Sequence, residues 1–187
     1  MGTIADLGDV LALSPFSMRK VFAGSVVWLL LFSGSAFGLE VFSTNSVWRF
    51  RRGTSEASTP TTAWRTNGFN DVAAGFTNAS GPFWYGDVYP GGTQLSDMQN
   101  NYSCIFLRRT FTIGNAAQVN SLRLAAFVDD GFVAWINGVE VARTNVPVGD
   151  PTYQTSVTNA TEPPPLRTYN LPAPGGYLVS GPNLIVV

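Results

Sequence analysis

Apolar and polar residues follow a β-strand pattern most clearly between residues 132 and 144. Nearly every residue of Phe132–Ile136 is β-branched or aromatic, and apolar residues alternate with polar ones along Val139–Thr144. Between the two runs stand Asn137 and Gly138, which tolerate a positive φ and suit the type I′ turn of a two-residue hairpin. The pattern therefore predicts a β-hairpin with these bounds.

Comparable short apolar runs recur through the rest of the chain after residue 45, separated about every ten residues by Gly, Pro, Thr, Ser or Asn. No amphipathic stretch of helical length interrupts them, so the pattern predicts an all-β protein. Residues 52–104, rich in Gly and Thr, are expected to form short strands and ordered loops that pack aromatic side chains inward. Besides the hairpin, strands are expected at Ser46–Arg51, Ile105–Ile113, Ser121–Val128, Arg167–Leu171 and Asn183–Val187.

The first 38 residues have the order of a secretory signal peptide. Met18-Arg19-Lys20 precedes the apolar run 21–32, and small residues lead to a cleavage point after Gly38. The run is short for a membrane span, although a retained anchor is the alternative. We expect a leader over 1–38, with Met18 as the better start, one domain over 39–187, and a secreted, extracellular or periplasmic location.

Composition removes several classes of function. Histidine is absent, which excludes Ser-His-Asp and Cys-His catalysis and the commonest zinc ligand. A net charge of −1 provides no field to attract nucleic acid or an anionic membrane. Asp129 and Asp130 could in principle cleave a glycosidic bond, but neighbours in an extended chain tend to point apart, whereas that reaction needs two facing carboxyl groups. The chain is predicted to be non-catalytic.

The basic residues and the single cysteine are interpreted as structural. Alternation places Arg49 and Arg51 on one face of a strand and Arg52 on the other, and a solvated strand face is expected for this cluster. Cys104 is the only cysteine, so an intrachain disulfide is impossible. Because Cys104 leads into an apolar strand, a buried thiol is predicted.

Trp64, Trp84 and Tyr85 are candidate carbohydrate-binding residues. All three lie in loop-like contexts near polar residues such as Arg65 and Asp87. Aromatic rings stack on the apolar faces of sugars while polar side chains satisfy the hydroxyl groups. The alternative is that the three rings belong to the core, because Trp and Tyr are mostly buried on average.

Asp129 and Asp130, followed by Gly131, form the second candidate site, at the mouth of the predicted hairpin. Loop carboxylates there could meet a sugar or a cation such as Ca²⁺, although calcium needs six to eight oxygen ligands and two residues supply only part of them. Alternatively the pair caps a turn, its side chains accepting backbone N–H bonds around Gly131.

The order "DDG, apolar strand, NG, VEVAR, N-x-P" over residues 129–147 resembles a β-sandwich module of the galactose-binding-like (jelly-roll) superfamily, common in large secreted bacterial proteins. Trp48-Arg49-Phe50, the segment 81–87 and the final 181–187 support the likeness. It implies a jelly-roll β-sandwich, a class whose members serve as carbohydrate-binding, adhesive or packing domains. The Asp129-Asp130 pair also resembles a cation and sugar site of calcium-dependent lectin modules of the anthrax-protective-antigen type.

In that family the last strand continues into a polar loop and another strand, so we expect the chain to be a fragment and its domain to be incomplete at the C-terminal end. The expected function is a non-catalytic extracellular carbohydrate-binding or adhesion module of a larger secreted protein. Its expected partners are a polysaccharide or glycan and other domains of the same chain, with Ca²⁺ as the candidate cofactor. The alternatives are a spacer without a ligand, and an accessory domain of an enzyme whose catalytic domain lies elsewhere.

Overall fold

The computed structural model describes residues 39–86, 90–159 and 166–187. The predicted leader over 1–38, with the apolar run considered as a membrane anchor, lies outside the described residues. Within the described ranges, no helix is long and apolar enough to span a membrane.

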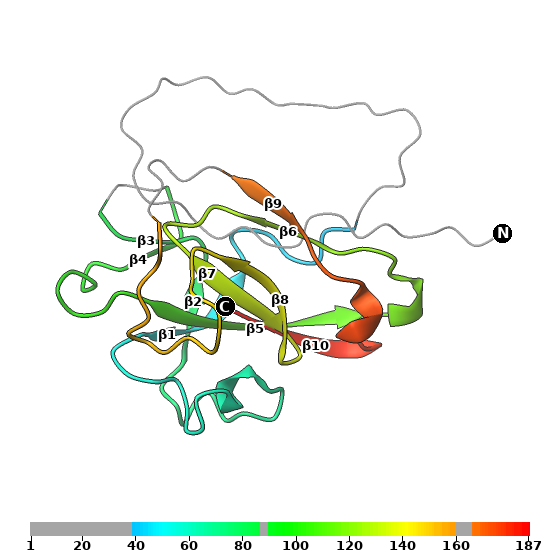
Figure 1. The fold of residues 1–187 in the computed structure, drawn as a ribbon, viewed down its shortest axis with the longest axis horizontal. Coiled ribbons are helices and arrows are strands. Elements are labelled where there is room, and N and C mark those ends of the chain that lie inside the picture. The colour runs from blue at the N-terminus through cyan, green and yellow to red at the C-terminus, as the bar shows by residue number, and fades with distance from the viewer. Residues whose placement is uncertain (1–38, 87–89, 160–165) are drawn as a thin grey trace, which may run out of the picture.

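Six antiparallel strands form the main sheet (Figure 1). Their spatial order is β2-β1-β5-β10-β7-β8, so that the C-terminal strand β10 lies between β5 and β7. The strands are β1 (Val47–Arg52), β2 (Thr77–Ser80), β5 (Ile105–Ile113), β7 (Phe132–Ile136), β8 (Val139–Thr144) and β10 (Gly181–Val186).

Two small strand pairs accompany this sheet. An antiparallel pair, β6 (Arg123–Ala126) with β9 (Arg167–Asn170), packs over one face of the main sheet, where the rings of Phe132 and Tyr169 meet edge to face at 5.1 Å. The other pair, β3 (Phe83–Trp84) with β4 (Thr93–Gln94), is parallel. Short 3₁₀ turns occur at η1 (Ala63–Arg65), η2 (Ala116–Gln118) and η3 (Pro174–Gly176). The prediction of an all-β protein is confirmed, and the structure shows that most of its strands pair antiparallel.

Side-chain alternation gives the main sheet a core on each face. On the face toward β6 and β9, Trp48, Leu107 and Ile136 pack with Leu124 of β6. The opposite face is covered by the segment 53–76. There the buried residues are Ala57, Trp64, Phe76, Phe106, Val133, Trp135, Leu184 and Val186. Because both faces are covered, all of β7 is buried, which explains its unbroken apolar sequence.

Arginine side chains fasten the segment 53–76 to the sheet. Arg49 donates to the Phe76 carbonyl at 2.6 Å, and Arg51 donates to the Ala74 carbonyl at 2.9 Å. Arg108 is buried and donates to the carbonyls of Trp64 and Thr66. The expected alternation along β1 is confirmed. Arg49 and Arg51 both reach the segment 53–76, whereas Arg52, the last residue of β1, pairs with Asp97.

The expectation of a solvated face for Arg49 and Arg51 is wrong. Both side chains are half-buried beneath a loop that folds back over them. That covering depends on residues more than twenty positions away in the chain, which no local strand pattern reveals.

The hairpin has the predicted bounds and the predicted turn. Asn137 and Gly138 have φ values of 51° and 83°, the positive pair that a type I′ turn requires. A register shift between Ala134 and Trp135 places an extra residue in β8, so Trp135 faces Glu140. Such a β-bulge increases the local twist of the ribbon.

Candidate functional site

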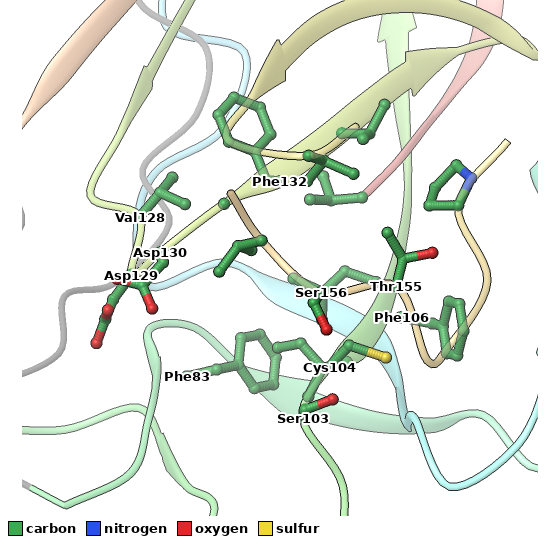
Figure 2. Close-up of a pocket in the computed structure, with 18 of the residues that line it drawn as sticks. Phe83, Ser103, Cys104, Phe106, Val128, Asp129, Asp130, Phe132, Thr155 and Ser156 are labelled. Carbon is green, nitrogen blue, oxygen red and sulfur yellow. The ribbon is translucent and has the colours of Figure 1, made fainter. Parts of the chain in front are cut away.

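A pocket of about 650 Å³ opens at the end of the main sheet where β5 and β7 begin and β10 ends. Its volume lies within the range of about 300–1,000 Å³ usual for small-molecule sites. Figure 2 shows Phe83, Ser103 and Cys104 along one side of the pocket, with Phe132 across from them. All the residues proposed from the sequence line this pocket, namely Trp64, Trp84, Tyr85, Asp129 and Asp130.

Trp84 and Tyr85 form an aromatic rim at the end of β3. Both residues are half-buried, and Tyr85 also packs against the core. The Trp84 indole Nε1 donates to the Gly91 carbonyl at 2.9 Å, which fixes the orientation of the ring. Beneath them the ring of Phe83 stacks on Phe50 at 5.1 Å and anchors the strand in the core. The rim therefore combines accessible ring surface with a rigid support.

Trp64 reaches the same pocket from the opposite face of the sheet, and it is only 3% exposed. Its ring contacts Phe106 and Trp135 edge to face, at 5.1 Å and 6.1 Å between centroids. Little of the indole remains for a sugar to stack on, which favours the core alternative for this residue. The sequence alone does not distinguish Trp64 from Trp84, because each is an aromatic residue in a loop-like context.

Asp129 and Asp130 lie in the loop that joins β6 to β7, and both are half-buried. In Figure 2 their carboxylates lie at the left edge of the pocket. The loop is fixed by Asn145, whose Nδ2 donates to the Asp130 carbonyl at 2.8 Å. At Gly131 a Cβ atom would lie 2.8 Å from both the Thr144 carbonyl oxygen and a Val157 methyl. Glycine is thus required for the backbone to approach this closely.

Within the described part of the chain, the structure brings no third acidic side chain to the candidate calcium site of Asp129 and Asp130. Among the described residues, no group of three or more Asp, Glu, Cys or His side chains is placed to hold a metal ion. Two neighbouring aspartates supply only part of the coordination shell that Ca²⁺ needs. Calcium binding by Asp129 and Asp130 stays a prediction.

The segment 145–158 forms a wall of the pocket that no motif had indicated. Its two ends meet where the Thr158 amide donates to the Asn145 carbonyl at 2.7 Å, and Arg143 donates to the Gly149 carbonyl at 3.0 Å. Thr155 and Ser156 of this wall line the pocket, and the Thr155 hydroxyl accepts a hydrogen bond from the Thr152 amide at 2.8 Å. These residues line the pocket only because the segment folds back on itself. Their positions in the sequence therefore do not predict that they belong to a site.

Arg65 ties this wall to the rest of the fold. Its guanidinium lies 3.9 Å from the centroid of the Trp135 ring and 2.7 Å from the Asp150 carboxylate. Arg65 is 6% exposed, whereas the Asp150 side chain is largely exposed. The ion pair therefore connects the core beneath the segment 53–76 with the surface of the wall.

Cys104 also lines the pocket, as a half-buried thiol whose Sγ donates to the Tyr153 carbonyl at 3.4 Å. Burial, followed by the nearby Glu56 carboxylate, raises the pKa of the Cys104 thiol to about 11. Only a very small fraction is thiolate near neutral pH, so the residue is not an activated nucleophile.

The pocket therefore has two parts. Its deeper part is lined by apolar side chains, including Ile105, Phe106, Phe132 and Val133. Its rim carries half-buried aromatic residues, two carboxylates and several hydroxyl-bearing side chains, the combination that accommodates a ligand with both C–H faces and hydroxyl groups.

Comparisons with known proteins give little beyond this geometry. No protein-family model and no curated protein sequence matches the chain. Among solved structures, a β-glucuronidase from an uncultured Clostridium species is similar, with a TM-score of 0.47 and 14% sequence identity. The likeness covers 76% of this chain and 20% of that enzyme, so the chain spans about a fifth of the length of the structure it matches.

Proposed function

We propose that the protein is a non-catalytic carbohydrate-binding module of a longer extracellular protein, with a jelly-roll fold of the galactose-binding type. The observation that carries this proposal is the pocket rim. Trp84 and Tyr85 line the same pocket as Asp129 and Asp130, although more than forty residues separate the two pairs in the chain.

Each part of the rim suits a sugar ring. The exposed surfaces of Trp84 and Tyr85 offer π-faces on which the C–H face of a sugar stacks. The carboxylates of Asp129 and Asp130 accept hydrogen bonds from sugar hydroxyl groups, and the Ser156 hydroxyl both donates and accepts. A few such contacts give an affinity of about micromolar or weaker.

The fold and the composition support the remaining parts of the proposal. A six-stranded antiparallel sheet covered on one face by the β6–β9 pair is the arrangement expected of a two-layered sandwich. The chain has no histidine. The two rim carboxylates come from adjacent residues in one loop, whereas glycoside hydrolysis uses a pair placed on either side of the scissile bond.

A polysaccharide array probed with the full chain tests the proposal. We expect binding to at least one polysaccharide, and Trp84→Ala should abolish it without changing the circular dichroism spectrum. Phe69→Ala is the matched control, because Phe69 is a half-buried aromatic residue outside the pocket. Absence of binding across a broad array would contradict the proposal and favour a spacer. Equal loss of binding in both variants would also contradict it.

The role of the carboxylates is tested separately. Asp130→Asn should weaken binding about tenfold if the carboxylate accepts sugar hydroxyl groups, because hydrogen bonds to charged groups contribute about 1.5–3 kcal/mol. Glu40→Gln, an exposed acid outside the pocket, is the control. Loss of binding in a chelator, restored by Ca²⁺, would instead assign the pair to a bound cation.

A further inference from the structure

Few charged side chains line the pocket. Among the residues that the structure describes, they are Arg65, Asp129 and Asp130. Arg65 is 6% exposed, and its guanidinium pairs with the Asp150 carboxylate at 2.7 Å. A cation that is buried and already paired is poorly placed to receive an anionic group of a ligand. Along the described part of the rim, the charge that a ligand meets is therefore negative, and it comes from two adjacent aspartates.

The loop that carries these carboxylates has a fixed backbone. The Asn145 side chain donates to the Asp130 carbonyl at 2.8 Å, and the Asn145 carbonyl accepts from the Thr158 amide at 2.7 Å. Asn145 has a φ of 53°, a left-handed conformation that Asn adopts more readily than most residues. One residue thus joins the acidic loop to both ends of the wall over 145–158. Because the loop is already held in place, it needs little ordering when a ligand binds.

The aromatic residues of the rim favour the same sign of ligand charge. Trp84 and Tyr85 line the pocket together with the two aspartates. The face of an aromatic ring is electrostatically negative, so it attracts a cation and repels an anion. The Trp84 indole N–H, the donor of that ring, already binds the Gly91 carbonyl at 2.9 Å. Carboxylates and rings are independent features of the rim, and both favour a cationic ligand over an anionic one.

We propose that the pocket binds an amino sugar with a protonated amine and excludes sugars that carry carboxylate groups. The ligand class rests on the carbohydrate-binding function proposed above. The sugar ring stacks on Trp84, and its ammonium group donates charge-assisted hydrogen bonds to Asp129 and Asp130. A uronic acid in the same position would bring its own carboxylate against the two aspartates, and such a contact between like charges opposes binding.

Calorimetric titration of the full chain with matched oligosaccharides tests the ligand class. The probes are tetramers of glucosamine and of galactosamine, each compared with its N-acetylated form, which keeps the sugar ring and lacks the charge. A chelator is present throughout, so that no metal ion bridges a ligand to the carboxylates. We expect at least one amino form to bind about tenfold or more tightly than its N-acetylated form, because hydrogen bonds between charged groups are the stronger ones. Tetragalacturonate, which is anionic, should not bind.

A protein variant assigns the preference to the two aspartates. Asp129→Asn combined with Asp130→Asn removes both charges and keeps the size of the side chains. In this double variant the ratio of the two affinities, amino form to N-acetylated form, should fall to about one. Glu40→Gln, at an exposed acid outside the pocket, is the control and should leave the ratio unchanged. Circular dichroism verifies that both variants fold, and the ligand comparison on the unaltered chain needs neither of them.

Four results would overturn this ligand class. They are equal affinity for the amino and N-acetylated forms, tighter binding of tetragalacturonate, no binding of either amino tetramer, and a preference that persists in the folded double variant. None of them by itself removes carbohydrate binding, because a neutral polysaccharide bound on the array would still support that function. Failure of the ligand class and failure of the proposed function are therefore distinguishable.

Discussion

Asn183 illustrates how one buried polar residue holds the start of β10. It is 0% exposed, and its side-chain amide donates to the carbonyls of Val179 and Gly181 at 2.8 Å and 3.0 Å. Its Oδ1 accepts from the Val179 amide and from the Asn137 side chain. These bonds close the turn before β10 and join it to the tip of the hairpin, which is a physical reason for Asn in the "GPN" sequence.

Replacement of Asn183 should therefore be costly. Asn183→Ala removes four hydrogen bonds and leaves buried partners unsatisfied, so we expect the free energy of unfolding to fall by about 3 kcal/mol. Urea denaturation measures the loss. Asn170→Ala, in the exposed part of β9, should change the stability by less than about 0.5 kcal/mol. Equal effects of the two substitutions would contradict the role assigned to Asn183.

The contribution of the Cys104 thiol to stability is expected to depend on pH. Burial raises its pKa from 9.0 to about 11, so the folded protein holds the thiol proton more tightly than the unfolded chain does. This stabilisation is present below about pH 9 and is lost as the pH rises through about 11.

Alkylation by iodoacetamide checks that prediction. In the native protein its rate should rise with a midpoint near 11, whereas in urea the midpoint should return to about 9. A native midpoint at or below 9 would show that the thiol is not shielded. The sequence predicted a buried thiol from the apolar strand that follows, but not that Tyr153, forty-nine residues away, accepts its hydrogen bond.

Among the elements, strands with strong local patterns could be predicted to the residue. Ile105–Ile113 and both strands of the hairpin have their expected bounds, because β-branched and aromatic runs end at turn residues. The expected strand Ser121–Val128 shortens to Arg123–Ala126, and Phe127 and Val128 belong instead to the loop that lines the pocket. β2, β3 and β4 have only two to four residues, too few for alternation to identify them.

The segment 53–76 depends on arginines for its attachment, and Arg108 is the most buried of those that bind its backbone. Burial lowers the pKa of Arg108, while the Asp71 carboxylate raises it. Arg108→Leu should lower the free energy of unfolding by about 3 kcal/mol, because it leaves loop carbonyls and Asp71 without their buried partner.

A surface ion pair is the control for that variant. Arg52 pairs with Asp97 at 2.6 Å, and both side chains are nearly half exposed. Arg52→Leu should cost about 1 kcal/mol or less. Hydrogen exchange in 53–76 should accelerate only in Arg108→Leu. If Arg52→Leu costs as much as Arg108→Leu, the arginines do not hold the segment in the way described.

For the whole molecule, the pocket depends on long-range folding that a local pattern cannot show. The sequence could single out Trp84, Tyr85, Asp129 and Asp130 by residue type and loop context. It could not place them on one pocket, nor distinguish the buried Trp64 from the half-buried Trp84. The wall over 145–158 lines the pocket only because this segment folds back on itself.

Export is a further prediction for the whole chain. Expressed with its own leader in a bacterial host, the protein should lose its residues through Gly38, because basic residues, an apolar run and small residues follow in the order that signal peptidase recognises. N-terminal sequencing of the exported protein would identify Leu39 as the first residue. A mature chain that still begins at Met1 or Met18 would contradict the secretory interpretation.

The most direct test of the central claim is a map of the ligand on the folded chain. The ligand would be an oligosaccharide derived from the polysaccharide that binds most tightly on the array. It would be titrated into ¹⁵N-labelled protein, and the amide chemical shifts would be followed by NMR. The account predicts that Trp84 and Tyr85 shift together with Asp129 and Asp130 along one binding curve, while the edge strand β2 stays unchanged. Shifts confined to a surface away from this rim would contradict it.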